Sequence, residues 1–158
     1  MTVPSDPVPA DDASDDNAPV IHWNAVFRGA TAGLFFLVLA SVIEALLDRN
    51  IDSFSDSGWI YPLFVLILFG YTLGGFGAGR LVPDAALSNG LLAGIGAFVL
   101  WIPIRIVIWL VRDENRSLFS GHSPALRPGQ IFGHLLIAAA LGMFGGFLGA
   151  RSITRARS

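Results

Sequence analysis

Apolar residues along this chain gather into four long runs that are separated by shorter polar segments. The runs cover approximately residues 25–47, 59–79, 90–111 and 130–150. Each run is close to the roughly 20 residues that an α-helix needs to cross the hydrocarbon core of a bilayer. A helix also satisfies its own backbone hydrogen bonds in lipid, and the chain lacks the alternation typical of barrel strands. The pattern therefore predicts four transmembrane helices.

Composition supports this prediction and defines the fold class. The chain has 158 residues, of which 53% are hydrophobic and only 14% are charged, with a mean hydropathy of +0.62. A soluble domain carries about 25% charged residues. We therefore expect an all-α integral membrane protein whose membrane domain covers residues 23–151. Trp23 precedes the first run and Trp59 begins the second, both at headgroup depth, where amphipathic rings are favoured.

The two ends of the chain differ in charge from the membrane domain. Residues 1–22 contain five Asp and four Pro but no Lys or Arg. This composition is typical of disordered chain, and it lacks the basic start and apolar core of a secretory signal. The sequence predicts a disordered acidic tail, either a solvated leader or a docking segment, and a short basic tail over residues 152–158.

Arginine placement predicts the orientation. Four spans put both termini on one side of the membrane, and five Arg near the span ends lie on that side against four on the other. The first group is Arg28, Arg80, Arg151, Arg155 and Arg157, and the second is Arg49, Arg112, Arg116 and Arg127. Because basic residues favour the cytoplasmic side, we expect a multi-pass protein of the cytoplasmic membrane with both termini in the cytoplasm.

Glycines spaced four residues apart mark the half of every run nearest the termini. The pairs are Gly29 and Gly33, Gly70 and Gly74, Gly75 and Gly79, Gly90 and Gly94, Gly142 and Gly146, and Gly145 and Gly149. Transmembrane helices associate through the close contact that such small residues allow. The opposite half of the runs carries bulkier side chains, so the bundle should be tightest at the terminal end. Packing within the chain, a homodimer seam and a hinge are the interpretations that the spacing leaves open.

The two halves of the chain resemble each other. Residues 28–33 match residues 89–94 at an offset of 61, and residues 74–80 match residues 145–151 at an offset of 71. The extra residues fall in the third loop, where insertions cost little. The sequence therefore predicts two similar helical hairpins, a 2+2 parallel pseudo-repeat about a two-fold axis along the membrane normal. Chance similarity between Gly- and Ala-rich segments is the alternative.

Three polar residues inside the runs are candidates for function. Glu44 and Arg105 are 61 residues apart, so they occupy equivalent positions of the two hairpins. Charges in hydrocarbon are expensive unless they are paired or hydrated. Glu44 and Arg105 therefore form either an intramembrane ion pair facing a vestibule, or two separate charges that reach the headgroups. His134, one turn into the fourth run, is either an interfacial hydrogen bonder or a proton relay.

Several function classes find no support in the residues. The net charge of −2 gives no basis for binding nucleic acid, and the absence of cysteine excludes thiol chemistry. No catalytic, cofactor-binding or metal-binding pattern occurs, and the Gly-rich segment over residues 70–80 lacks the Lys-Ser/Thr end of a phosphate loop. We therefore expect a protein that is not an enzyme and that needs no cofactor or metal.

Three short motifs carry a resemblance to a known group of proteins. They are the aromatic-then-Gly opening of residues 23–33, the GGFGAGRLVP segment of residues 74–83 and the LSNG segment of residues 87–90. In these features, over roughly residues 22–151, the chain resembles small four-helix bacterial integral membrane proteins, of actinobacterial type, that have no known function. The resemblance implies a four-helix fold and a place in the cytoplasmic membrane, and it brings no site residues.

These observations favour a structural or accessory membrane component that acts through helix packing. Its expected partners are the lipid bilayer and either a second copy of the chain or another membrane protein. The alternative is a small dimeric transporter or channel that uses Glu44 and Arg105 as its polar element.

Overall fold

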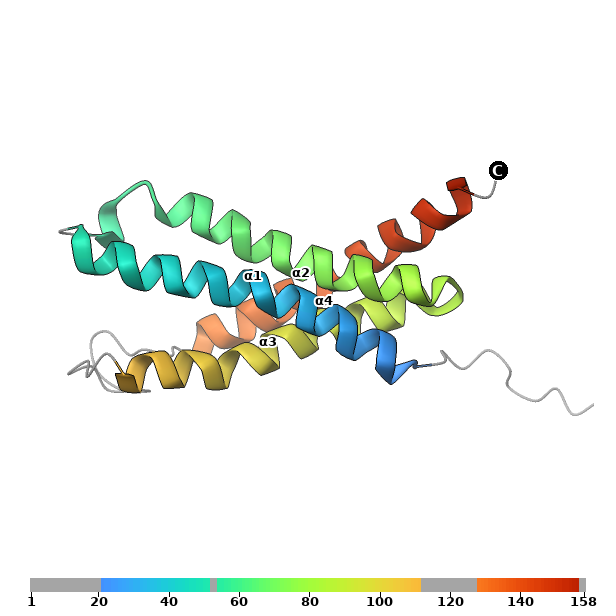
Figure 1. Ribbon diagram of the computed structural model, residues 1–158, viewed down its shortest axis with the longest axis horizontal. Coiled ribbons are helices and arrows are strands. Elements are labelled where there is room, and N and C mark those ends of the chain that lie inside the picture. The colour runs from blue at the N-terminus through green and yellow to red at the C-terminus, as the bar shows by residue number, and fades with distance from the viewer. Residues whose placement is uncertain (1–20, 52–53, 112–127, 157–158) are drawn as a thin grey trace, which may run out of the picture.

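Four long helices form the protein, as the computed structural model shows (Figure 1). The structure describes residues 21–51, 54–111 and 128–156, so most of the expected acidic tail and the third loop lie outside it. The helices are α1 (Trp23–Asn50), α2 (Ile60–Leu81), α3 (Ala86–Val111) and α4 (Pro128–Ala156), with short 3₁₀ helices η1 (Phe54–Asp56) and η2 (Pro83–Ala85). All four long helices are long and apolar enough to cross a membrane. The predicted all-α fold with four helices that could span a membrane is confirmed at this level.

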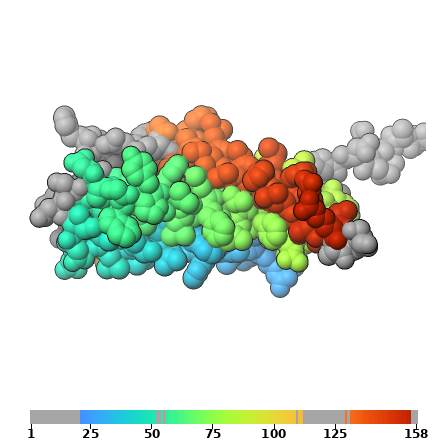
Figure 2. Space-filling model, turned by 90° about the horizontal axis from the view of Figure 1, so that it is seen from above, coloured from blue at the N-terminus to red at the C-terminus, as the bar shows by residue number. Residues whose placement is uncertain are grey.

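The helices pack in a ring in which α2 and α3 also touch across the middle. Helix α1 packs against α2 and α3, α4 packs against the same two helices, and α1 and α4 share almost no contacts. The start of α1, the η2 turn and the end of α4 lie at one end of the bundle (Figure 1). We call this the terminal end and the opposite one the loop end. The space-filling view shows α4 lying along α2 toward the terminal end (Figure 2).

This arrangement does not have the expected two-fold axis. An axis along the membrane normal that exchanges α1 with α3 and α2 with α4 would turn the α2–α3 contact into an equal α4–α1 contact. The α2–α3 contact is extensive and the α4–α1 contact is almost absent. The two hairpins lie side by side instead, with α1 beside α3 and α2 beside α4.

Several helix boundaries differ from the predicted ones. Helix α4 runs to Ala156 and so takes in most of the expected basic tail. Helix α3 begins at Ala86, directly after η2, so Ser88 lies inside α3, where its hydroxyl donates to the carbonyl oxygen of Ala85 at 3.1 Å. Helix α3 continues through Pro103.

Burial is concentrated toward the terminal end. Among the residues whose burial is described, the last buried one of α1 is Ser41, the last of α3 is Phe98 and the first of α4 is Ala138. A core cluster takes members from all four helices: Ala30, Leu37, Tyr71, Ala97, Phe98 and Ala138. The distribution agrees with the expectation that the terminal half is the tightly packed one.

Asn89 anchors the start of α1 to α3. Its side chain is fully buried, and its Oδ1 accepts the backbone N–H of His22, the N-cap of α1, at 2.8 Å. Its Nδ2 donates to the carbonyl oxygen of Ala85 at 2.8 Å. The first backbone N–H groups of a helix have no partner inside the helix. Asn89 therefore supplies a cap from 67 residues away.

Replacing Asn89 by Leu should destabilise the bundle by about 0.5–2 kcal/mol, the usual cost of losing a helix N-cap, since it removes the acceptor of the part-buried His22 N–H while keeping the same number of side-chain heavy atoms. The measurement is the free energy of unfolding in mixed micelles. Ser88→Ala is the control, because the hydrogen bond of the Ser88 hydroxyl to Ala85 stays within its own turn. Equal losses for Asn89→Leu and Ser88→Ala would contradict the capping role.

Candidate functional site

The predicted glycines all lie inside the bundle. All twelve are buried, and for each of them an added Cβ would approach the backbone of a neighbouring helix. At Gly29 it would meet the carbonyl oxygen of Gly74, and at Gly33 it would lie 2.9 Å from the carbonyl oxygen of Gly70. These contacts form the seam between α1 and α2. Small residues here let two backbones touch, as expected for helices that associate in lipid.

Two further seams converge on α4. Gly75 and Gly79 of α2 face Gly142 and Gly146 of α4. Gly142 and Gly146 also face Gly90 of α3, where an added Cβ would lie 2.5 Å from the carbonyl oxygen of Gly142. Helix α2 thus uses one glycine pair for α1 and another for α4. The glycine pairs are engaged in contacts inside a single chain.

The pair Gly145 and Gly149 differs from the other pairs in what its members meet first. An added Cβ at Gly145 would meet the carbonyl oxygen of Thr72, and one at Gly149 would meet the carbonyl oxygen of Phe76. These two glycines of α4 therefore pack on backbone of α2 that carries larger side chains. Gly149 also lies well inside its helix and not at the end of it, because α4 runs beyond the predicted limit of residue 150 to Ala156.

The second hairpin closes in a different register from the first. Gly29 and Gly33 face Gly74 and Gly70, whereas the matching Gly90 and Gly94 face Gly142 and Ala138. Contact-equivalent positions of α2 and α4 therefore differ by 68 residues (142 − 74 and 138 − 70). The sequence match gives an offset of 71. The difference of three residues is nearly one helical turn.

The other half of the bundle holds the polar candidates. Arg105 of α3 and Glu44 of α1 form a two-pronged ion pair, with Nη1 2.7 Å from Oε2 and Nη2 3.1 Å from Oε1. Each residue lies six positions before the last residue of its helix, or about 9 Å along the axis. Their side chains are 27% and 37% exposed, respectively, at the bundle surface. The structure brings together the two charges that sequence spacing made equivalent.

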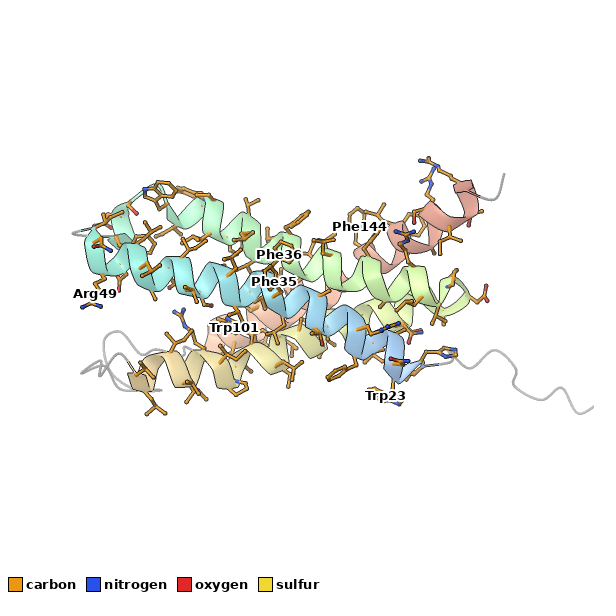
Figure 3. All side chains as sticks on the ribbon, in the orientation of Figure 1. Trp23, Phe35, Phe36, Arg49, Trp101 and Phe144 are labelled. Carbon is orange, nitrogen blue, oxygen red and sulfur yellow. The ribbon has the colours of Figure 1, made fainter. Side chains whose placement is uncertain are left out.

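Trp101 supports this pair from one turn deeper (Figure 3). Its ring lies 5.7 Å from the guanidinium carbon of Arg105, and its Nε1 donates to the hydroxyl of Ser41 at 2.9 Å. The ring of Phe98 also stacks on that of Trp101, with ring centroids 6.0 Å apart. Two polar contacts thus connect α1 to α3 in one register, at Ser41–Trp101 and at Glu44–Arg105.

His134 joins the cluster through a ring contact. It lies on α4, and its ring centroid is 6.4 Å from that of Trp101 at an interplanar angle of 39°. The structure therefore places His134 beside the aromatic support of the ion pair. Ser41 and Trp101 were missed by sequence reasoning, because a serine and a tryptophan are unremarkable in a transmembrane run. Their one signal was a spacing of 60 residues, close to the offset of the hairpins.

The polar groups of this cluster bind one another, which limits the reactions that they could carry out. A guanidinium and a carboxylate in fork geometry satisfy each other's charge and hydrogen bonds. Among the described residues, no buried side-chain nitrogen or oxygen lacks a hydrogen-bond partner, and no group of three or more His, Asp or Glu could hold a metal ion. The cluster is suited to fixing two helices against each other.

A shallow hollow lies next to the pair on the outside of the α1–α3 seam. Its volume is about 210 Å³, and it is lined by Val42, Ala45, Leu46 and Arg49 of α1 and by Ile108 of α3. Neither Glu44 nor Arg105 is among these lining residues. The walls are apolar and the one charged group is at the loop end of α1.

Comparisons with known proteins found no protein-family model, no curated protein and no solved structure that matches this chain. The resemblance to small four-helix bacterial membrane proteins stays a prediction.

Proposed function

We propose that this protein is a structural or accessory component of a membrane, acts through helix packing and catalyses no reaction. The observation that carries the proposal is the way its polar and small residues are used. The glycines are engaged between helices of the same chain, and Glu44 and Arg105 satisfy each other. Such groups stabilise a bundle, and what they leave for interaction is an apolar outer surface that faces lipid or another membrane protein.

The proposal includes a location and an orientation. We place the chain in the cytoplasmic membrane with both termini in the cytoplasm, on the basis of the small Arg excess at the terminal end and of the resemblance stated above. The two hairpins are proposed to be copies of one ancestral hairpin whose closing register has since shifted. The matched offset of Gly29 and Gly33 with Gly90 and Gly94 supports this origin.

A second candidate is a small transporter or channel. The observation in its favour is that the ion pair is partly exposed and lies in the more loosely packed half of the bundle. A vestibule reaching it from the loop end would have to contain water, whereas an accessory protein would be dry at this depth.

Cysteine labelling separates the two candidates, because the chain has no native thiol. Glu44→Cys, Arg105→Cys and Ala45→Cys are placed one at a time in the full chain in vesicles and exposed to a membrane-impermeant maleimide. Ala45→Cys matters most, since it leaves the ion pair intact. We expect all three to react as slowly from either side as Ala40→Cys, a position that is 1% exposed.

Gly58→Cys is the positive control, because position 58 lies in the first loop with open space around it. Labelling of Ala45→Cys at the rate of Gly58→Cys would replace the accessory function by the transporter. Fast labelling of Glu44→Cys or Arg105→Cys alone would show only that an unpaired charge draws in water.

A further inference from the structure

The two ends of the hollow beside the ion pair differ in the same way as the hydrocarbon core and the headgroup layer of a membrane. Its four α1 residues are Val42, Ala45, Leu46 and Arg49, which have the spacing of one helical face over two turns. Val42 lies eight residues before the end of α1, or about 12 Å deep along the axis, whereas Arg49 lies in the last turn. The deep end is therefore apolar and the shallow end is cationic.

Arg49 lacks an internal counter-charge among the described residues, with none of which it makes a hydrogen bond or an ion pair. Its side chain is exposed and lines the hollow, and it extends from the loop end of α1 (Figure 3). Of the nearest carboxylates along α1, Glu44 is held by Arg105, and Asp48 has an interaction of its own. An anion from outside the chain would complete this end of the hollow.

We propose that the hollow binds an anionic phospholipid. One acyl chain lies along Val42, Leu46 and Ile108, and the phosphate of the headgroup accepts hydrogen bonds from Arg49. A guanidinium is well suited to phosphate oxygens because its donors form a planar fork. The inference requires the chain to span a membrane, and it is independent of whether the protein is an accessory component or a transporter.

The size of the hollow favours a lipid chain over a protein partner. About 210 Å³ is smaller than the range of roughly 300–1,000 Å³ that pockets for drug-sized ligands occupy. A partner helix is about 10–12 Å across with its side chains, so it could place only a single side chain in a space bounded by five residues of two adjoining helices. A flexible acyl chain can follow such a groove.

Photo-crosslinking in vesicles tests the proposal on the full chain. The vesicles consist of phosphatidylcholine with a small fraction of a lipid that carries a diazirine in its acyl chain, either phosphatidylglycerol or phosphatidylcholine. Adducts are mapped by peptide mass spectrometry. We expect adducts on the peptides holding Leu46 and Ile108 to be about fivefold more frequent with phosphatidylglycerol, the preference that one Arg near an anionic headgroup provides.

Three variants make the test specific. Arg49→Gln should reduce the phosphatidylglycerol adducts to the phosphatidylcholine level, whereas Arg28→Gln, which removes an exposed Arg at the opposite end of α1, should leave the preference unchanged. Ala45→Leu fills the hollow without changing charge and should lower the adducts of both lipids on Ile108. Each variant is first shown to elute as the native chain does on size exclusion.

Four results would overturn the inference. One is equal adduct yields for the two lipids in the native chain. Another is an unchanged preference in Arg49→Gln. The third is the absence of adducts of either lipid from the peptides holding Leu46 and Ile108, which would show that no acyl chain occupies the hollow. Adducts spread evenly over Phe35 and Leu39 as well would indicate unselective boundary lipid and would count against a site.

Discussion

Gly75→Ala should largely abolish folding of the bundle, although it adds a single methyl group. That methyl would meet the carbonyl oxygen of Gly142 far inside contact distance, and it would lie 2.7 Å from the carbonyl carbon and 2.8 Å from the Cα of the same residue. All three atoms belong to the backbone of α4, so no side chain can turn away. The two helices have to separate along the seam that joins the hairpins.

The expected loss of stability is large because no other contact can replace the seam between α2 and α4. Overpacking in a well-packed core costs about 1–3 kcal/mol and more where backbone must move. In lipid, no hydrophobic force restores a separated helix pair, since lipid tails cover the exposed surface equally well. We expect a loss at the upper end of this range or above, measured as the yield of native chain on size exclusion and as the free energy of unfolding in mixed micelles.

Two other glycines of α2 are matched controls with the same gain in helix propensity. An added Cβ at Gly77 has its nearest neighbour at 3.9 Å, so Gly77→Ala should be neutral or slightly stabilising. At Gly70 the closest atom is Cδ1 of Leu37 at 2.8 Å, a side-chain end that can move, so Gly70→Ala should fall between the two. If Gly75→Ala and Gly77→Ala were equally stable, the glycine seam would not be the basis of the fold.

The features that the sequence predicted well are those that follow from periodic patterns of residues. Four apolar runs of bilayer length predict four helices, because hydropathy and helix geometry alone determine where a chain crosses lipid. The same holds for the glycine spacing. Residues four apart share a helix face, so Gly70 and Gly74 had to face one neighbour together. The choice of that neighbour was not contained in the pattern.

The features that the sequence did not predict depend on how two distant helices meet. Asn89 caps α1 from α3, and nothing in its local sequence points to His22 as its partner. Ser41 and Trp101 meet in the same way across 60 residues. The ring of helices also differs from the symmetric one, because α2 rather than α1 contacts both helices of the other hairpin. Small changes in side-chain volume decide such choices, and a single sequence does not show them.

The continuation of α4 beyond the predicted transmembrane run has a local cause. The segment after Arg151 is polar, so its hydropathy predicts the end of the transmembrane run. Helix propensity is a separate property, and arginine and alanine are both good helix formers. The backbone hydrogen bonds of α4 therefore continue to Ala156 although the apolar pattern has ended.

Neutralising Glu44 alone should damage the bundle more than neutralising Glu44 and Arg105 together. In Glu44→Gln, the guanidinium of Arg105 keeps its charge but loses its carboxylate, about 9 Å from the end of its helix. An unpaired Arg at the centre of a transmembrane helix costs about 2.5–3.5 kcal/mol on insertion scales, and the cost is lower nearer the interface. We therefore expect Glu44→Gln to lose about 1–3 kcal/mol, and the double variant Glu44→Gln/Arg105→Gln to recover part of this loss.

The four chains of this cycle are compared by free energy of unfolding in mixed micelles and by yield of native chain. The coupling energy is the difference between the loss of stability in the double variant and the sum of the losses in the two single variants, and it measures the strength of the Glu44–Arg105 pair.

The charge-swapped chain Glu44→Arg/Arg105→Glu tests the role of Trp101 in addition. It restores opposite charges, but it moves the guanidinium away from the ring of Trp101, which lies on α3 beneath position 105. We expect only partial recovery in the swapped chain, and the deficit then measures the support from Trp101. If the two single losses simply add in the double variant, Glu44 and Arg105 act as separate interfacial charges and the fixed register of α1 on α3 has to come from the Ser41–Trp101 bond and the glycine seams.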